Sequence, residues 1–175
     1  MQAMVLRGLS PLADNPEPLT AMEMPDPEPA AGELLVAVFA CGVCHTELDE
    51  IEGRTPPPRL PVVPGHQVIG RVVGLGRGAE RFRIGDRVGV GWIHSACGVC
   101  DACRAGSENL CANFRATGRD VNGGYGELLT VPEAFAHPIP ALFSDVQAAP
   151  LLCAGAIGYR SLRLTGLRDG QSLGL

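Results

Sequence analysis

The sequence predicts a mainly β fold, an irregular β-barrel that carries a cysteine-rich lobe and is followed by a helical segment. Short β-branched and apolar runs alternate with proline and glycine clusters as far as residue 131. Four cysteines gather between residues 97 and 111, and the first helical pattern begins only after residue 143. The chain has 175 residues, of which 46% are hydrophobic and 19% charged, so it can form a packed core.

The expected strands, in chain order, are residues 34–39, 62–63, 68–73, 87–90 and 128–131. Turn sequences separate them at residues 85–86 and 122–124. Residues 74–79 match the dinucleotide-binding pattern G-x-G-x-x-A directly after a strand. That pattern needs a helix behind it, and the turn at residues 85–86 leaves no room for one. We therefore predict a hairpin connection there.

The helical segment begins at a capping box, S-x-x-Q at residues 144–147, and an apolar stretch follows as far as Leu164. Pro150, Gly155 and Gly158 are expected to divide it. A turn at residues 169–170 then leads into residues 171–175, which we expect to begin a strand. The predicted division is a β domain at residues 1–143 and a connecting helix with the start of another domain at residues 144–175.

The spacing C-x2-C-x2-C-x7-C at Cys97, Cys100, Cys103 and Cys111 favours a closed zinc site. Tetrahedral Zn²⁺ accepts four thiolates at about 2.3 Å, and such a site orders a loop, here residues 94–115, but leaves no open position for chemistry. Local disulfides, packed free thiols and an iron–sulfur cluster remain alternatives. The bacterial ferredoxin motif, however, ends x3-C-P, whereas this one ends x7-C-A.

Charge and composition exclude several partners. The formal net charge of −5 and a pI near 5.3 remove the attraction on which nonspecific binding to nucleic acid or anionic membranes depends. The longest apolar run, residues 34–44, falls short of the roughly 20 residues that span a bilayer. Seven cysteines are an odd number, and the N-terminal residues lack a secretory signal, so we expect a reducing cytoplasm.

A second metal site must draw on the remaining cysteines and histidines. These are Cys41, Cys44, Cys153, His45, His66, His94 and His137. A catalytic zinc needs three ligands, which can come from distant segments, and keeps its fourth position open. Residues 41–45 also match C-x-x-C-H, but neither haem attachment nor a thioredoxin-like site has the export signal or βαβ unit it would need. Each of these side chains could equally be a packed core residue.

Four short motifs surround these candidates in a fixed order. They are Cys44-His45-Thr46-Glu47, Pro64-Gly65-His66-Gln67, Gly85-Asp86-Arg87-Val88 and Leu152-Cys153-Ala154-Gly155. Together with the cysteine lobe they resemble the zinc-dependent medium-chain alcohol dehydrogenases, over nearly the whole chain. The resemblance implies a GroES-like barrel, one structural and one catalytic Zn²⁺, NAD or NADP as cofactor, and a homo-oligomer at full length. It also implies that a Rossmann domain would follow the strand near residue 175.

The resemblance further implies a role for each matching residue. Cys44, His66 and Cys153 would bind a catalytic zinc that polarises the alcohol oxygen. Thr46 would take the alcohol proton into a relay. Asp49 stands where some relatives have the histidine that ends the relay, so the outer relay would use a carboxylate or pass directly to water.

Three further residues match functional positions of the family, and two other residues differ from the residue that the family usually has. His45 would contact the dinucleotide pyrophosphate, Glu47 would orient the zinc-bound histidine, and Trp92 would narrow the pocket for small primary alcohols. Trp92 could instead be a core residue. Gln67 replaces a glutamate that can approach the zinc, and Ile157 replaces a threonine that commonly touches the nicotinamide.

The sequence thus predicts the catalytic half of a zinc-dependent alcohol dehydrogenase, which would interconvert small alcohols and aldehydes with NAD or NADP. The alternative is a zinc-stabilised β-module with no activity of its own. In either case the isolated 175 residues are expected to be inactive, because they contain no cofactor-binding turn.

Overall fold

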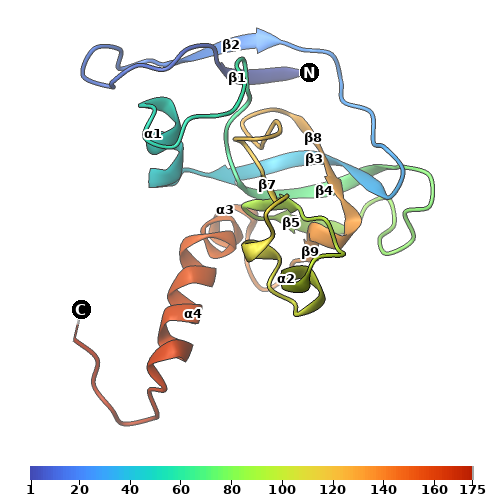
Figure 1. Cartoon of the computed structure of the whole chain (residues 1–175). Coiled ribbons are helices and arrows are strands. Elements are labelled where there is room, and N and C mark those ends of the chain that lie inside the picture. Colours follow the sequence, from blue (N-terminus) through green and yellow to red (C-terminus); the bar gives the residue numbers. More distant parts are fainter. Residues whose placement is uncertain (175) are drawn as a thin grey trace.

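The computed structural model describes residues 1–174, and its centre is a curled antiparallel sheet of five strands in the order β8-β3-β4-β5-β9 (Figure 1). These strands are β3 (Glu33–Gly42), β4 (Gln67–Leu75), β5 (Arg87–Val90), β8 (Leu128–Pro132) and β9 (Ala136–Pro138). The expected mainly β fold is confirmed. Four of the five predicted strands are found, but residues 62–63 form only an isolated bridge, in which Val62 pairs with Leu6.

Two small sheets complete the β structure. They are β1 (Gln2–Leu6) with β2 (Leu19–Glu23), and β6 (Ile93–Ser95) with β7 (Arg115–Ala116). The short helices are α1 (His45–Ile51), α2 (Asp101–Arg104), η1 (Glu108–Leu110) and η2 (Glu133–Phe135). The cysteine lobe projects from the barrel between β6 and β7, so those two strands form the base of the lobe (Figure 1).

The core lies inside the curl of the central sheet. Leu34 and Val36 alternate with less buried residues along β3, as expected of a strand with one buried face. They pack with Val68, Val72 and Val88 from the neighbouring strands, all fully buried. Burial of one such side chain contributes about 1.5–3 kcal/mol, so the predicted strands are also the segments that hold the barrel together.

The connection between β4 and β5 is the predicted hairpin. The two strands pair antiparallel, and the residues between them form no helix. At Gly76, a Cβ atom would lie 1.8 Å from the backbone oxygen of Ala30, so only glycine allows the two backbones to approach. The glycine-rich pattern therefore serves backbone packing in this chain.

The C-terminal helical segment consists of α3 (Asp145–Ala148), η3 (Ala149–Leu152) and α4 (Ala154–Thr165). The capping box is confirmed, because Ser144 N–H donates to Gln147 Oε1 at 3.1 Å and Ser144 Oγ accepts from Gln147 N–H at 3.3 Å. The expected breaks are only partly right. Pro150 lies in η3, but Gly155 and Gly158 lie within an unbroken α4, where glycine lowers stability without interrupting the backbone hydrogen bonds.

The expected strand at residues 171–175 is wrong for residues 171–174, which have no regular secondary structure; Leu175 lies outside the described residues. A strand needs a partner ladder, and no strand of residues 1–174 pairs with this segment. Figure 1 shows α4 extending away from the barrel, and it has no buried residue. Among the described residues, no helix has the length and apolar character needed to cross a membrane.

Candidate metal centres and active-site cleft

The four cysteines of the lobe converge on one point. The sulfurs of Cys97, Cys100, Cys103 and Cys111 all lie within 4.8 Å of one another. Sγ of Cys103 is 3.5 Å from that of Cys100 and 3.9 Å from that of Cys97. A tetrahedral ion with bonds of 2.3 Å needs sulfurs about 3.8 Å apart, so the spacing fits one zinc. All four thiols are free, which argues against local disulfides.

One thiol of this lobe is prepared to bind a metal ion. The backbone N–H groups of Val99 and Cys100 point at the Cys97 sulfur and, with hydrogen bonds from Cys111 and Cys100, lower the pKa of Cys97 to about 6. Metal binding requires the thiolate. Near neutral pH this ligand is therefore already in the binding form.

A second cluster brings together three segments that are far apart in the sequence. Cys44 directly precedes α1, His66 directly precedes β4, and Cys153 joins η3 to α4. Their donor atoms all lie within 4.8 Å of one another, and the two sulfurs are 3.8 Å apart. The ring atom Nε2 of His66 is buried and has no partner among the described residues. Two thiols and one imidazole fit three corners of a zinc tetrahedron and leave the fourth open.

Glu47 supports two of these three donors. Its Oε1 lies 2.6 Å from Nδ1 of His66, although the two atoms are not aligned as in an ideal hydrogen bond. Its Oε2 accepts a hydrogen bond from the backbone N–H of Cys44 at 2.7 Å. The carboxylate is buried, with only 2% of the side chain exposed. A contact at Nδ1 turns Nε2 toward the two thiols, which is how carboxylates orient metal-binding histidines.

The second cluster lies in a cleft of about 890 Å³. His66 and Cys153 line it together with Thr46, whose Oγ1 is 3.5 Å from Cys44 Sγ. Trp92 also lines the cleft and packs against Phe114 with ring centroids 4.8 Å apart. Further apolar lining comes from Phe135, Leu152 and Ile157, and polar lining from Glu108, Asn109, His137 and Arg160. Of this further lining, the sequence had indicated Ile157 and His137 as candidates and Leu152 as part of the motif around Cys153; Phe135, Glu108, Asn109 and Arg160 belong to none of the motifs.

His45 and Asp49 do not line this cleft. The His45 side chain is 76% exposed at the start of α1, with Nε2 3.7 Å from Oδ1 of Asp49. The same Asp49 oxygen accepts from Nε of Arg54 at 2.5 Å. Asp49, the expected end of a proton relay, is thus paired with an arginine that the sequence had not indicated.

Three of the other expected candidates have buried environments. Burial raises the pKa of Cys41 to about 12, which makes it an inert thiol. Gln67 is buried at the start of β4 and is 3% exposed. His94 is buried outside the cleft. A further buried carboxylate, Glu50, was not predicted; burial and the neighbouring Glu47 raise its pKa to about 8.

A curled β-barrel with one four-thiol cluster and one open two-thiol, one-imidazole cluster is typical of metal-dependent dehydrogenases. Comparison with known proteins agrees. The family model for the alcohol dehydrogenase GroES-like domain matches residues 30–141. The chain belongs to this family, as the sequence motifs had indicated.

Individual relatives are also alcohol dehydrogenases. The chain is 54% identical over 164 residues to the protein named "Probable alcohol dehydrogenase AdhA" of Mycobacterium tuberculosis (strain CDC 1551 / Oshkosh). This match covers 90% of this chain and 47% of that protein. It is 41% identical to an alcohol dehydrogenase of Geobacillus stearothermophilus, over 89% of this chain and 46% of that one. A solved NAD-dependent alcohol dehydrogenase is 32% identical with a TM-score of 0.87, over 97% of this chain and 49% of that one. The chain thus spans about half the length of these relatives.

Proposed function

We propose that this chain forms the catalytic domain of a zinc-dependent alcohol dehydrogenase, which uses NAD or NADP to interconvert small primary alcohols and aldehydes. The observation that carries the proposal is the convergence of Cys44, His66 and Cys153 in a cleft, with donor atoms within 4.8 Å of one another. A module that used zinc only for stability would need the closed lobe and no open cluster. The free thiols of both clusters suit a reducing compartment such as the cytoplasm.

A zinc ion at this cluster would act as a Lewis acid on the alcohol oxygen. The chain's own residues prepare the site in three ways. Glu47 orients His66 and fixes the backbone at Cys44. Thr46 places a hydroxyl beside the cluster and on the cleft surface, where it accepts the alcohol proton and passes it outward. The buried Glu47 carboxylate also offsets part of the positive charge of the metal.

The lining of the cleft wall favours apolar substrates. Trp92, Phe135, Leu152 and Ile157 line the same cleft as His66 and Cys153, and packing against Phe114 holds Trp92 in place. Apolar lining excludes water and favours the binding of a hydrocarbon chain. This lining is consistent with a small primary alcohol or the matching aldehyde as substrate.

We infer that cofactor binding requires residues other than 1–174. Residues 1–174 contain no glycine-rich turn that leads into a helix, because the only matching pattern is the β4–β5 hairpin. The exposed His45 could contact a pyrophosphate, but it cannot hold a nicotinamide against the cleft alone. We therefore expect the 175 residues alone to bind zinc and to show no turnover, and a longer, oligomeric protein to be the working enzyme.

A chimera tests this proposal. Residues 1–175 are joined to the remaining half of the 54% identical relative, and NADH or NADPH formation from ethanol and 1-butanol is followed by absorbance. The chimera should oxidise at least one alcohol, and Cys153→Ser should abolish turnover while the lobe keeps its zinc. A folded chimera that binds two zinc ions but stays inactive with both cofactors would contradict the proposal, as would steady turnover by the 175 residues alone.

A further inference from the structure

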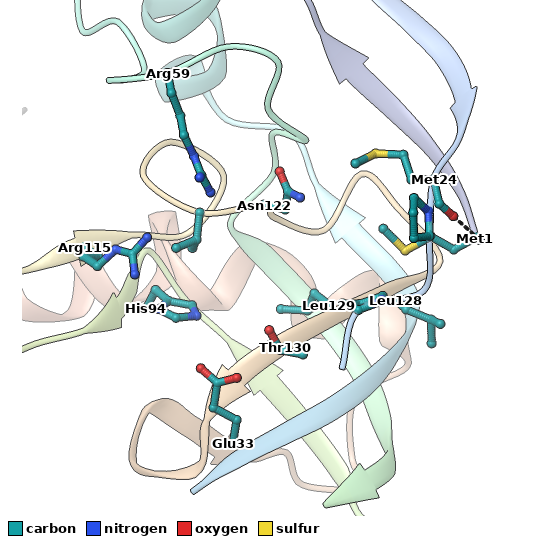
Figure 2. Close-up of a pocket in the computed structure, with 13 residues that line it drawn as sticks. Met1, Met24, Glu33, Arg59, His94, Arg115, Asn122, Leu128, Leu129 and Thr130 are labelled. Carbon is teal, nitrogen blue, oxygen red and sulfur yellow. Dashed lines mark hydrogen bonds between the residues drawn. The ribbon is translucent and has the colours of Figure 1, made fainter. Parts of the chain in front are cut away.

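A second cavity, of about 270 Å³, lies apart from the active-site cleft and shares no lining residue with it (Figure 2). The strand β6 separates the two. Ile93 lines the cleft, and the next residue, His94, lines the cavity. Neighbouring residues on a strand point to opposite faces, so β6 forms a wall common to both spaces.

One end of the cavity carries two arginines. Figure 2 shows the Arg59 side chain reaching toward Arg115 and His94 from a different part of the chain. Within residues 1–174, Arg59 forms no ion pair or side-chain hydrogen bond, and the Arg115 guanidinium donates only to the backbone oxygen of Asp120, at 3.2 Å. A guanidinium group has five N–H donors, so most donors at this end are free to bind a ligand.

His94 is a third polar group at this end, and it is almost completely buried. The residue is 5% exposed, and its ring atom Nδ1 is buried without a partner among the described residues. Burial lowers the pKa of His94, and Arg115 lowers it further, against the opposing effects of Glu33 and the Thr130 carbonyl. The imidazole is therefore uncharged at neutral pH, and the positive charge of the cavity comes from its arginines.

Glu33 limits this charge. Figure 2 shows it below His94, on the side of the cavity away from Arg59, and its Oε2 accepts from the backbone N–H of Ala30 at 3.0 Å. The N-terminal ammonium of Met1 also borders the cavity, but Asp26 pairs with it at 2.7 Å. Two guanidinium groups against one carboxylate leave one positive charge in excess. That excess suits a ligand with a single negative charge better than a phosphate dianion.

The opposite wall is apolar. Met24 and Leu128 face the arginine end across the cavity, with Met1 beside them (Figure 2). A volume of 270 Å³ is slightly below the roughly 300 Å³ at which drug-sized ligand sites begin, so the cavity suits only a small molecule. The shape and chemistry together fit a molecule with one carboxylate and a hydrocarbon chain of a few carbons.

We propose that this cavity binds a small organic monocarboxylate, with the carboxylate at Arg59 and Arg115 and the hydrocarbon chain against Met24 and Leu128. Arginine holds carboxylates through paired N–H donors, and charge-assisted bonds of this kind are stronger than neutral ones. Asn122 adds a side-chain amide to the lining between Arg59 and Met24 (Figure 2); its Oδ1 is already used by the backbone N–H of Val63, so its NH₂ group remains available to a ligand.

The test is an NMR titration of the zinc-loaded, ¹⁵N-labelled chain with sodium butanoate. Butanamide, which has the same shape without the charge, and inorganic phosphate are titrated in parallel. Butanoate should shift the signals of Arg59, Arg115 and Asn122 and bind at least about tenfold more tightly than either comparison compound, as expected for the loss of a charge-assisted hydrogen bond. Phosphate binding as tightly as butanoate would overturn the proposed ligand class, and no shifts with any compound would overturn the site.

Two variants and one control locate the binding. Arg59→Ala changes an exposed residue without protein partners, so it should weaken butanoate binding about tenfold or more without loss of folding. Arg77→Ala removes another exposed arginine, which does not line the cavity, and should have no effect. Carboxylates can also bind an open metal site, so the titration is repeated in Cys153→Ser. Butanoate shifts confined to Thr46 and Trp92, and lost in Cys153→Ser, would place the binding at the metal centre and refute the second site.

Discussion

Replacing Glu47 with glutamine should weaken zinc binding at the open cluster and leave the four-cysteine lobe unaffected. One Glu47 oxygen lies 2.6 Å from Nδ1 of His66, and the other accepts from the Cys44 backbone N–H at 2.7 Å. Both neighbours present an N–H to this side chain when Nε2 binds a metal. Glutamine has one acceptor oxygen and one donor nitrogen, so it can satisfy only one of the two contacts.

The size of the effect can be derived from this geometry. A hydrogen bond to a charged group contributes about 1.5–3 kcal/mol, and one such bond is lost. Loss of an outer carboxylate partner typically costs about 10–100-fold in metal affinity, which corresponds to about 1.4–2.7 kcal/mol. The two estimates agree. Glu47→Gln should therefore lower zinc affinity at the open cluster by about 10–100-fold.

Competition with a chromophoric chelator measures this change, because it resolves the two zinc ions by affinity. Glu50→Gln is the matched control: it replaces another buried acidic side chain of α1, one that forms no hydrogen bond or ion pair with His66 or Cys44 in the described residues. The control should change affinity less than about threefold, within the usual effect of a mutation that breaks no named contact. If Glu47→Gln stayed within the same limit, Glu47 would not position the ligands and the reasoning would be refuted.

Three further predictions can be tested by single substitutions. In the chimera, Thr46→Val should reduce kcat about 10²–10⁴-fold with zinc content unchanged, and retention of more than half the rate would exclude a proton-transfer role. Glu50 has a pKa of about 8 in the fold against 4.5 when free, so the folded state holds an extra proton between these pH values and loses stability as the pH rises through that range. Urea unfolding should show Glu50→Gln within about 1 kcal/mol of the wild type at pH 5 but up to about 4 kcal/mol more stable at pH 8, and parallel pH curves for the two proteins would contradict this. Cys100→Ser should lower the unfolding midpoint and remove one zinc, whereas Cys153→Ser should remove one zinc with little change in the midpoint; equal destabilisation by both would argue against separate roles.

The clustering of the cysteine lobe could be predicted from spacing alone because its four cysteines are close in the sequence. Residues only three apart must also lie close in space, so the spacing itself limits what they can bind. The open cluster is different. Cys44, His66 and Cys153 come from segments that meet only in the folded barrel, and no spacing rule brings them together. Here the prediction depended on family resemblance, and the structure shows that the three donors do converge.

The failures of the sequence prediction also have physical reasons. The strands β1 and β2 were not predicted, and they pair with each other. Because β2 has no buried residue, burial imposes no apolar alternation on its sequence that could reveal the strand. The pairing of Asp49 with Arg54 and the cavity at His94 depend on side chains from loops whose positions only the folded chain defines. Gly155 and Gly158 were expected to break a helix, but glycine only weakens a helix and does not remove a backbone donor as proline does.

The placement of the cysteine lobe affects how metal depletion should be interpreted in this protein. Its base strands carry His94 and Arg115, and Trp92 and Phe114 lie next to those strands. The backbone N–H of Thr117, just after β7, also donates to the Trp92 carbonyl at 2.9 Å. If both clusters bind zinc as proposed, loss of the ion from the lobe would therefore disturb the cleft wall even when the open cluster kept its own ion. Inactivation by EDTA would not by itself identify the catalytic metal; the zinc remaining at each cluster must be counted separately.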